Sequence, residues 1–212
     1  MQRTPEKMSQ SNVILRPVVS KQFCSTSLKV FTVRKRPCTI NGGGFVVMDS
    51  SHGDEIFRVE GCGAAVKDRA LLQDAEGNGV LCIKREVGIV QVFSLHKKWK
   101  GFVPDEIDGH EKPIFKASSS ICSANDSVKV SLIQSKAKKG WDYEIVGSFA
   151  ERACTIYDDS HAIAAKVSLN NVVKDAIRSK DVYNVEVQAG IDQAFVFGLV
   201  AVLEKLSGED GN

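Results

Sequence analysis

The run "AFVFGLVAVL" at residues 194–203 carries no polar side chain in ten consecutive positions. Asp192 before it is a typical N-cap residue, and Lys205 with Gly208 supplies signals found at helix ends. We therefore predict a helix over residues 192–206. A helix that is apolar on every side must be buried on every side, and ten apolar residues are about half of what a bilayer span requires. We expect this helix to lie inside the protein.

Short β-rich runs separated by turn residues fill most of the remaining chain. Val128, Val130 and Leu132 alternate with polar neighbours, as in a strand with one buried face. A barrel of about eight strands is filled by its own side chains, whereas about eleven strands leave room for a helix. We predict a mainly β fold, a closed antiparallel barrel of about twelve strands that encloses the C-terminal helix. The twelve candidate strands are LKVFTVRK, FVVMD, EIFRVEG, RALLQDA, VLCIKREV, VQVFSLH, PIFKAS, SVKVSLIQ, YEIVGSF, ACTIYDD, AIAAKVSL and DVYNVEVQ.

Three of these runs share a weak internal repeat in which apolar residues lead into an aspartate, turn, and return as a second strand. Asp49, Asp74 and Asp158 hold the aspartate position. Short acidic side chains at turns usually accept hydrogen bonds from the local backbone. We interpret the three aspartates as turn residues in consecutive hairpins and not as metal ligands or acid–base groups.

The chain is predicted to form one domain. Residues 1–17 are polar and include two prolines, so we expect a flexible N-terminal tail. Residues 18–207 form the barrel domain with its central helix, and residues 208–212 form a short C-terminal tail. With 28 basic and 26 acidic residues the net charge is +2, so no strong overall field favours nucleic acid or membrane binding. We expect a monomer.

Cysteine spacing and the N-terminal residues indicate an intracellular protein. The six cysteines form neither a CxxC pair nor a dense disulfide framework, so reduced thiols are expected. Residues 1–12 contain no apolar stretch of a signal peptide, and no run reaches the length of a transmembrane helix. We expect a soluble cytoplasmic protein, with a peripheral position at the plasma membrane or a nuclear location left open.

Four segments follow one another along the chain between about residue 18 and residue 206: "GGGFVVMDSSHGDEIFRV", "SLHKKW", "VGSFAERACTIYDD" and "VYNVEVQAGIDQAFVFGLVAVLEKL". In this order they resemble the LURP-one-related proteins of plants. The resemblance implies a fold similar to Tubby C-terminal domains and phospholipid scramblases. It also implies an association with plant pathogen defence and, by analogy with Tubby, a role as a membrane-tethered regulator of transcription. It carries no catalytic motif with it.

No catalytic, cofactor or metal motif is found. The four histidines are widely spaced, and no cysteine belongs to a ligand pair, so no zinc site is predicted. "NGGGF" at residues 41–45 runs into a strand and lacks the helix N-terminus of a phosphate loop. "GCGAAV" lacks the third glycine of the dinucleotide fingerprint, and no GxSxG is present. We expect a protein that is not an enzyme and uses no cofactor.

Three basic clusters are the remaining candidate sites. They could contact anionic phospholipid headgroups, with Trp99 or Trp141 at headgroup level. Alternatively, each is a solvated hairpin end with its tryptophan packed on the barrel wall. Acidic residues between 105 and 111 would weaken the field of the first cluster. The clusters are Lys97, Lys98 and Lys100; Lys136, Lys138 and Lys139; and Arg34, Lys35 and Arg36.

Two functions of different class follow from this sequence. The first is peripheral recognition of anionic phospholipid headgroups, such as phosphoinositides, by a Tubby-like barrel. The second is a protein-interaction scaffold in defence signalling that binds protein partners and no lipid. The sequence shows no signal for direct nucleic-acid binding.

Overall fold

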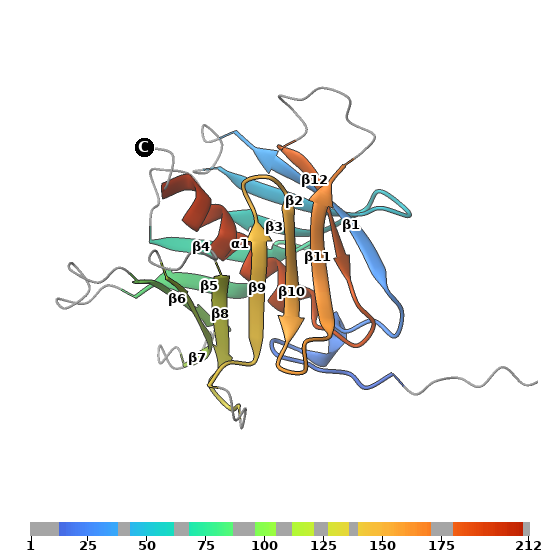
Figure 1. Ribbon diagram of the computed structural model, residues 1–212. Coiled ribbons are helices and arrows are strands. Elements are labelled where there is room, and N and C mark those ends of the chain that lie inside the picture. Colours follow the sequence, from blue (N-terminus) through green and yellow to red (C-terminus); the bar gives the residue numbers. More distant parts are fainter. Residues whose placement is uncertain are drawn as a thin grey trace, which may run out of the picture.

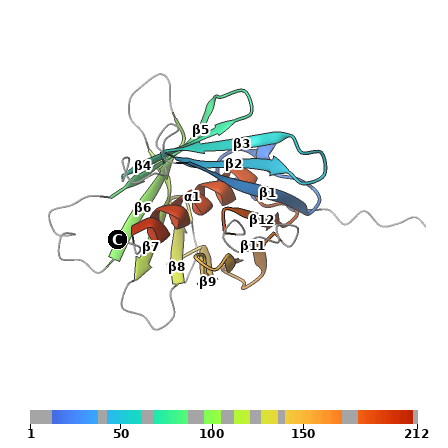
Figure 2. The same ribbon diagram turned by 90° about the horizontal axis from the view of Figure 1, so that it is seen from above.

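The computed structural model describes residues 13–37, 43–61, 68–86, 96–104, 112–120, 127–135, 140–170 and 180–209. Twelve antiparallel strands form a closed barrel around one helix, which confirms the predicted fold (Figures 1 and 2). Each strand pairs with its neighbours in sequence, and β1 closes the barrel against β12. The strands are β1 (Lys29–Arg36), β2 (Gly44–Asp49), β3 (Glu55–Glu60), β4 (Arg69–Asp74), β5 (Gly79–Arg85), β6 (His96–Phe102), β7 (Pro113–Ser120), β8 (Ser127–Leu132), β9 (Tyr143–Ser148), β10 (Ala153–Asp158), β11 (Ile163–Leu169) and β12 (Val182–Val187).

Helix α1 (Gln193–Glu209) runs through the barrel, as its apolar composition predicts (Figure 2). The side-chain oxygen Oδ1 of Asp192 accepts the backbone N–H of Phe195 at 3.1 Å, which confirms Asp192 as the N-cap. The end of the helix was predicted wrongly. The helix continues beyond the predicted end at residue 206 to Glu209 and includes Gly208 as its second-last residue.

Aromatic contacts fill the space between helix and barrel wall. The Phe195 ring lies 5.4 Å from Phe115 and 5.0 Å from Tyr143, and the Phe197 ring lies 5.2 Å from Phe31. On the β5 side the helix presents Gly198, where an added Cβ would lie 2.4 Å from a methyl group of Leu81. The missing side chain therefore lets the helix approach β5 closely, so the helix is off-centre in the barrel.

The three repeat aspartates end strands and bind the turns that follow, as predicted. Asp49 accepts the backbone N–H of Ser51 at 2.7 Å, and Asp74 accepts that of Asn78 at 2.7 Å. Asp158 accepts the backbone N–H groups of Ser160 and Ala162, each at 2.9 Å. Each carboxylate satisfies turn amides that lack a partner in the sheet, which explains the repeat.

The first basic cluster lies on a strand where the sequence predicted none. The expected strand VQVFSLH lies outside the described residues except for His96, and β6 instead covers HKKWKGF. Trp99 is 1% exposed and points into the barrel, so it does not lie at headgroup level. Its burial outweighs the polar character of its neighbours, because a buried tryptophan contributes a large apolar area. The first basic cluster therefore belongs to a strand and not to a hairpin end.

The chain before β1 closes the barrel end at which α1 begins. It includes a short 3₁₀ turn, η1 (Lys21–Phe23). The Oδ2 atom of Asp192 accepts three backbone N–H groups, from Val18 at 3.0 Å, Val19 at 2.7 Å and Ser20 at 3.0 Å. Arg16, which the sequence placed in the tail, forms an ion pair with Asp158 at 2.5 Å. No helix in the described part of the chain is long and apolar enough to span a membrane.

Candidate functional site

The cluster Arg34, Lys35 and Arg36 does not form a single surface. Successive residues of β1 point to opposite faces, so Lys35 turns toward the barrel end and its Nζ lies 3.2 Å from Glu204. Arg36 is largely covered and lies 3.5 Å from Glu60. The third cation, Arg34, is exposed. This cluster is therefore dispersed by the strand geometry.

The cluster Lys97, Lys98 and Lys100 is also divided by its strand. Lys98 and Lys100 lie on the outward face of β6, on either side of the buried Trp99, whereas Lys97 lies in the opposite phase. Lys98 is exposed. The third cluster, Lys136, Lys138 and Lys139, and the acidic segment 105–111 lie outside the described residues.

The barrel brings Lys98 and Lys100 together with four cations from other strands. Lys100 lies directly opposite Lys84 of β5 and Lys116 of β7, and Lys84 lies opposite Arg69 of β4. A second row runs from Lys98 through Ser118 to Lys129 of β8. We call the set the basic band; its residues come from β4 to β8, which are neighbouring strands of the barrel wall (Figure 1). Its members are Arg69, Lys84, Lys98, Lys100, Lys116 and Lys129.

Alternation along each strand turns the basic band outward. The residues next to its members, such as Ala70, Ile83, Phe115 and Val130, are at most 1% exposed and face the helix. Directly opposite residues in an antiparallel pair have Cβ atoms about 4.5–5.5 Å apart, and like charges at these positions destabilise the sheet. The row from Arg69 through Lys84 and Lys100 to Lys116 therefore places like charges side by side on the outer wall.

Two carboxylates lie beside the basic band: Glu144 of β9 lies directly opposite Lys129, and Glu86, which follows β5 directly, contacts Lys100. Its Oε1 lies 2.6 Å from Nζ of Lys100, and its backbone N–H donates to the carbonyl oxygen of Lys98 at 2.9 Å. The hydrogen bond from Lys100 lowers the pKa of Glu86, and the positive charges of Lys100, Lys98 and Lys116 lower it further. Glu86 is therefore ionised at neutral pH.

A buried ionic cluster surrounds Glu204 near the end of α1. Its Oε1 accepts the hydroxyl of Tyr183 at 3.1 Å and lies 3.1 Å from the guanidinium of Arg152. That guanidinium also stacks between the rings of Tyr183 and Phe149, at 4.2 and 4.3 Å. Both charges are nearly inaccessible, with side chains 5% and 7% exposed. The cluster anchors the helix to the wall through Glu204, Tyr183 and Arg152.

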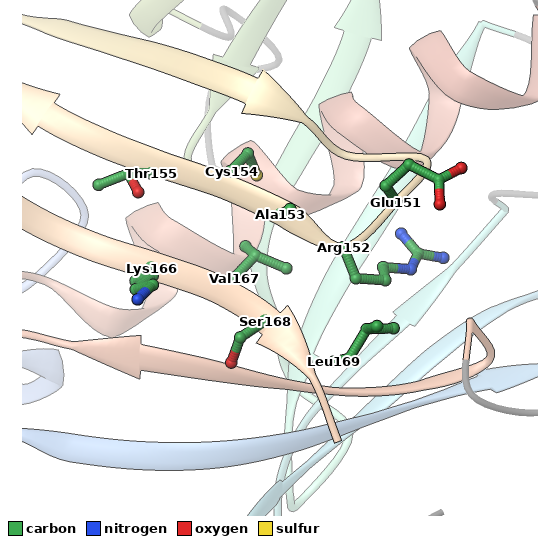
Figure 3. Close-up of a pocket in the computed structure, with 9 residues that line it drawn as sticks. All are labelled: Glu151, Arg152, Ala153, Cys154, Thr155, Lys166, Val167, Ser168 and Leu169. Atoms are coloured by element: carbon green, nitrogen blue, oxygen red, sulfur yellow. The ribbon is translucent and has the colours of Figure 1, made fainter. Parts of the chain in front are cut away.

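A pocket of about 420 Å³ lies at β10, β11 and the turn before β10 (Figure 3). Figure 3 shows Glu151 and Arg152 at one end and Lys166 at the other. Arg152 is already bound to Glu204, and burial raises the pKa of the Cys154 thiol to about 12. This thiol therefore stays protonated at neutral pH.

The cysteines and the side chains that could bind a metal form no further site in the described part of the chain. Cys24, Cys82 and Cys154 are unpaired among the cysteines that the structure describes. Within the described ranges, no group of three or more His, Cys, Asp or Glu side chains could hold a metal ion.

Sequence reasoning missed Arg69, Lys84, Lys116 and Lys129. They come from four different strands, and none of them belongs to a run of three basic residues along the chain. The available signal was the alternation of Lys116 and Lys129 with buried neighbours, combined with antiparallel pairing of consecutive strands. The basic band is thus visible only when the register is known.

The structure defines a closed twelve-stranded antiparallel barrel around a central helix, with a basic outer wall. The profile of the LURP-one-related family matches residues 29–204. Protein LURP-one-related 6 of Arabidopsis thaliana is 37% identical over 92% of this chain and 98% of its own. Protein LURP-one-related 16 of the same plant is 38% identical over 95% and 97%. The chain belongs to the LURP-one-related family, as the sequence resemblance indicated.

A crystal structure of a further Arabidopsis thaliana protein has the same fold. It covers 90% of this chain and 98% of its own, with a TM-score of 0.64 and 22% sequence identity.

Proposed function

We propose that this protein binds anionic phospholipid headgroups at a membrane surface and catalyses no reaction. The basic band is the observation that carries the proposal. Each Lys or Arg near an anionic surface contributes about 1 kcal/mol, so its six cations supply on the order of 6 kcal/mol if all reach the membrane. That free energy corresponds to a Kd of roughly tens of micromolar, as expected for reversible peripheral binding.

In this proposal the barrel is a cytoplasmic regulatory protein that is held at a membrane through its outer wall. The family name links the chain to plant defence, and we infer a role in that response. The alternative is a protein-interaction scaffold in defence signalling that needs no lipid.

Vesicle flotation tests the proposal with a matched pair of triple variants. The band variant changes Lys98, Lys116 and Lys129 to Gln, and the control variant changes Lys21, Arg34 and Lys166 to Gln. All six side chains are exposed, and both variants lose the same charge. Exposed lysines contribute little to stability, so the melting temperature should stay nearly unchanged in both.

The parent and the control variant should float with phosphatidylcholine vesicles that contain phosphatidic acid or phosphatidylserine, less so as salt rises. The band variant should lose most of this binding. A band variant that floats like the parent would show that the basic band is not the contact surface. A parent that floats with neither vesicle at any salt concentration would leave the scaffold function as the better account.

A further inference from the structure

Glu86 places an anion of the chain itself inside the basic band. Its carboxylate receives a hydrogen bond from Lys100 and lies in the combined field of Lys98 and Lys116. Its backbone is bound to β6 through the carbonyl oxygen of Lys98, so the side chain starts from a fixed position beside these lysines. Lys116 of β7 lies directly opposite Lys100, and Lys98 lies two residues before Lys100 on the same outward face of β6.

We propose that Glu86 is an internal competitor in a phosphate subsite of the basic band, which makes the band selective for lipid headgroups that carry a phosphomonoester. The inference rests on the proposed function and adds to it the chemical class of the headgroup. The ligand displaces the Glu86 carboxylate from Lys100 and binds the three lysines with its own phosphate.

The charge of the ligand decides whether displacement is favourable. The carboxylate is tethered beside Lys100, so it competes at an effective concentration in the millimolar range. A headgroup with only a phosphodiester offers one negative charge, as the carboxylate does, and gains little by replacing it. A phosphomonoester carries about −1.5 to −2 charges at pH 7 and three strong acceptor oxygens. It therefore replaces one anionic contact with several stronger ones.

The charge-neutral variant Glu86→Gln tests this inference, and Glu186→Gln serves as the matched control. Glu186 lies on β12, opposite Lys166 of β11 and away from the basic band, and its loss changes the net charge by the same amount. Circular dichroism and the melting temperature verify that both variants fold. Binding is measured with phosphatidylcholine vesicles containing phosphatidic acid, a phosphomonoester, or phosphatidylserine, a phosphodiester, at matched zeta potential.

The parent and the control variant should bind phosphatidic acid vesicles severalfold more tightly than phosphatidylserine vesicles. Glu86→Gln should bind phosphatidylserine vesicles about fivefold more tightly than the parent, the factor that one additional cation near the surface supplies. The preference for phosphatidic acid should shrink accordingly.

Three results would overturn the inference. If the parent binds both vesicles equally, or if Glu86→Gln gains no more than Glu186→Gln, the proposed function stands and the role of Glu86 fails. If neither the parent nor Glu86→Gln binds either vesicle, the proposed function itself fails. If inorganic phosphate alone binds as tightly as the phosphatidic acid vesicles, the subsite serves a free phosphate and not a lipid.

Discussion

The carboxylate of Asp192 is expected to be among the most important side chains for stability. It is fully buried and accepts four backbone N–H groups, from Val18, Val19 and Ser20 and from Phe195 of the helix. It therefore connects the entry of α1 to the segment that closes the barrel end. The substitution Asp192→Ala removes all four acceptor contacts at once.

The magnitude follows from these four hydrogen bonds. A hydrogen bond to a charged group contributes about 1.5–3 kcal/mol, so independent bonds would sum to about 6–12 kcal/mol. The segment at 18–20 is half-exposed, so water can replace the carboxylate there, whereas the buried Phe195 amide stays unsatisfied. We expect Asp192→Ala to lower the free energy of unfolding by on the order of 4 kcal/mol. That is a large part of the usual 5–15 kcal/mol of a domain.

Urea denaturation and amide hydrogen exchange measure the effect. Asp74→Ala is the matched control, because Asp74 accepts one backbone N–H and one side-chain amide of Asn78 in a surface turn. It should lose only about 1 kcal/mol. In Asp192→Ala the amides of residues 18–20 should exchange much faster than in the parent. Equal losses in the two variants, or unchanged protection at residues 18–20, would refute the assignment of Asp192 as the link between segment and helix.

Two further predictions concern the backbone and acid stability. At Gly44 φ is +133° and an added Cβ would lie 1.9 Å from the carbonyl oxygen of Val59. Gly44→Ala should therefore lower the free energy of unfolding by more than about 3 kcal/mol or prevent folding. A urea titration measures this against the control Gly77→Ala, whose added Cβ would lie in open space. Burial tends to raise the pKa of Asp158, but hydrogen bonds from Ser160 and Arg16 outweigh it and the pKa is lowered. The stabilisation is therefore complete above the unfolded pKa of about 4 and is lost as the pH falls through the lower folded value. The urea midpoint of the parent should decrease as the pH falls below about 5, and that of Asp158→Asn should decrease less steeply. Equal pH dependence of the two midpoints would contradict a contribution of ionised Asp158 to stability.

The barrel could be predicted because its signals are local. The unbroken apolar run of the helix and the alternation in strands such as β8 depend only on neighbouring residues. The turn aspartates were predictable for the same reason, since each binds amides within a few positions. Local reasoning failed at β6, where the lysines around Trp99 looked like a loop although one buried ring defines the inward face.

The candidate surface could not be predicted because it is non-local. Lys84 and Lys116 are separated by a whole strand and its connections, yet both lie opposite Lys100. The same alternation that builds the barrel also dispersed Arg34, Lys35 and Arg36, which are consecutive in the chain. Runs of basic residues in a strand therefore predict a basic surface poorly, whereas cations spaced two residues apart predict it better.

The closure of β1 against β12 around α1 has a consequence for biosynthesis. The ribosome makes the helix after all twelve strands, so the apolar inner faces of the strands are synthesised before the element that covers them. Until β12 has emerged, β1 and the newest strand are both open edges, which are prone to pairing with other chains. The barrel must therefore complete its folding late, and a nascent chain paused before Val182 should depend on chaperones that bind exposed strands.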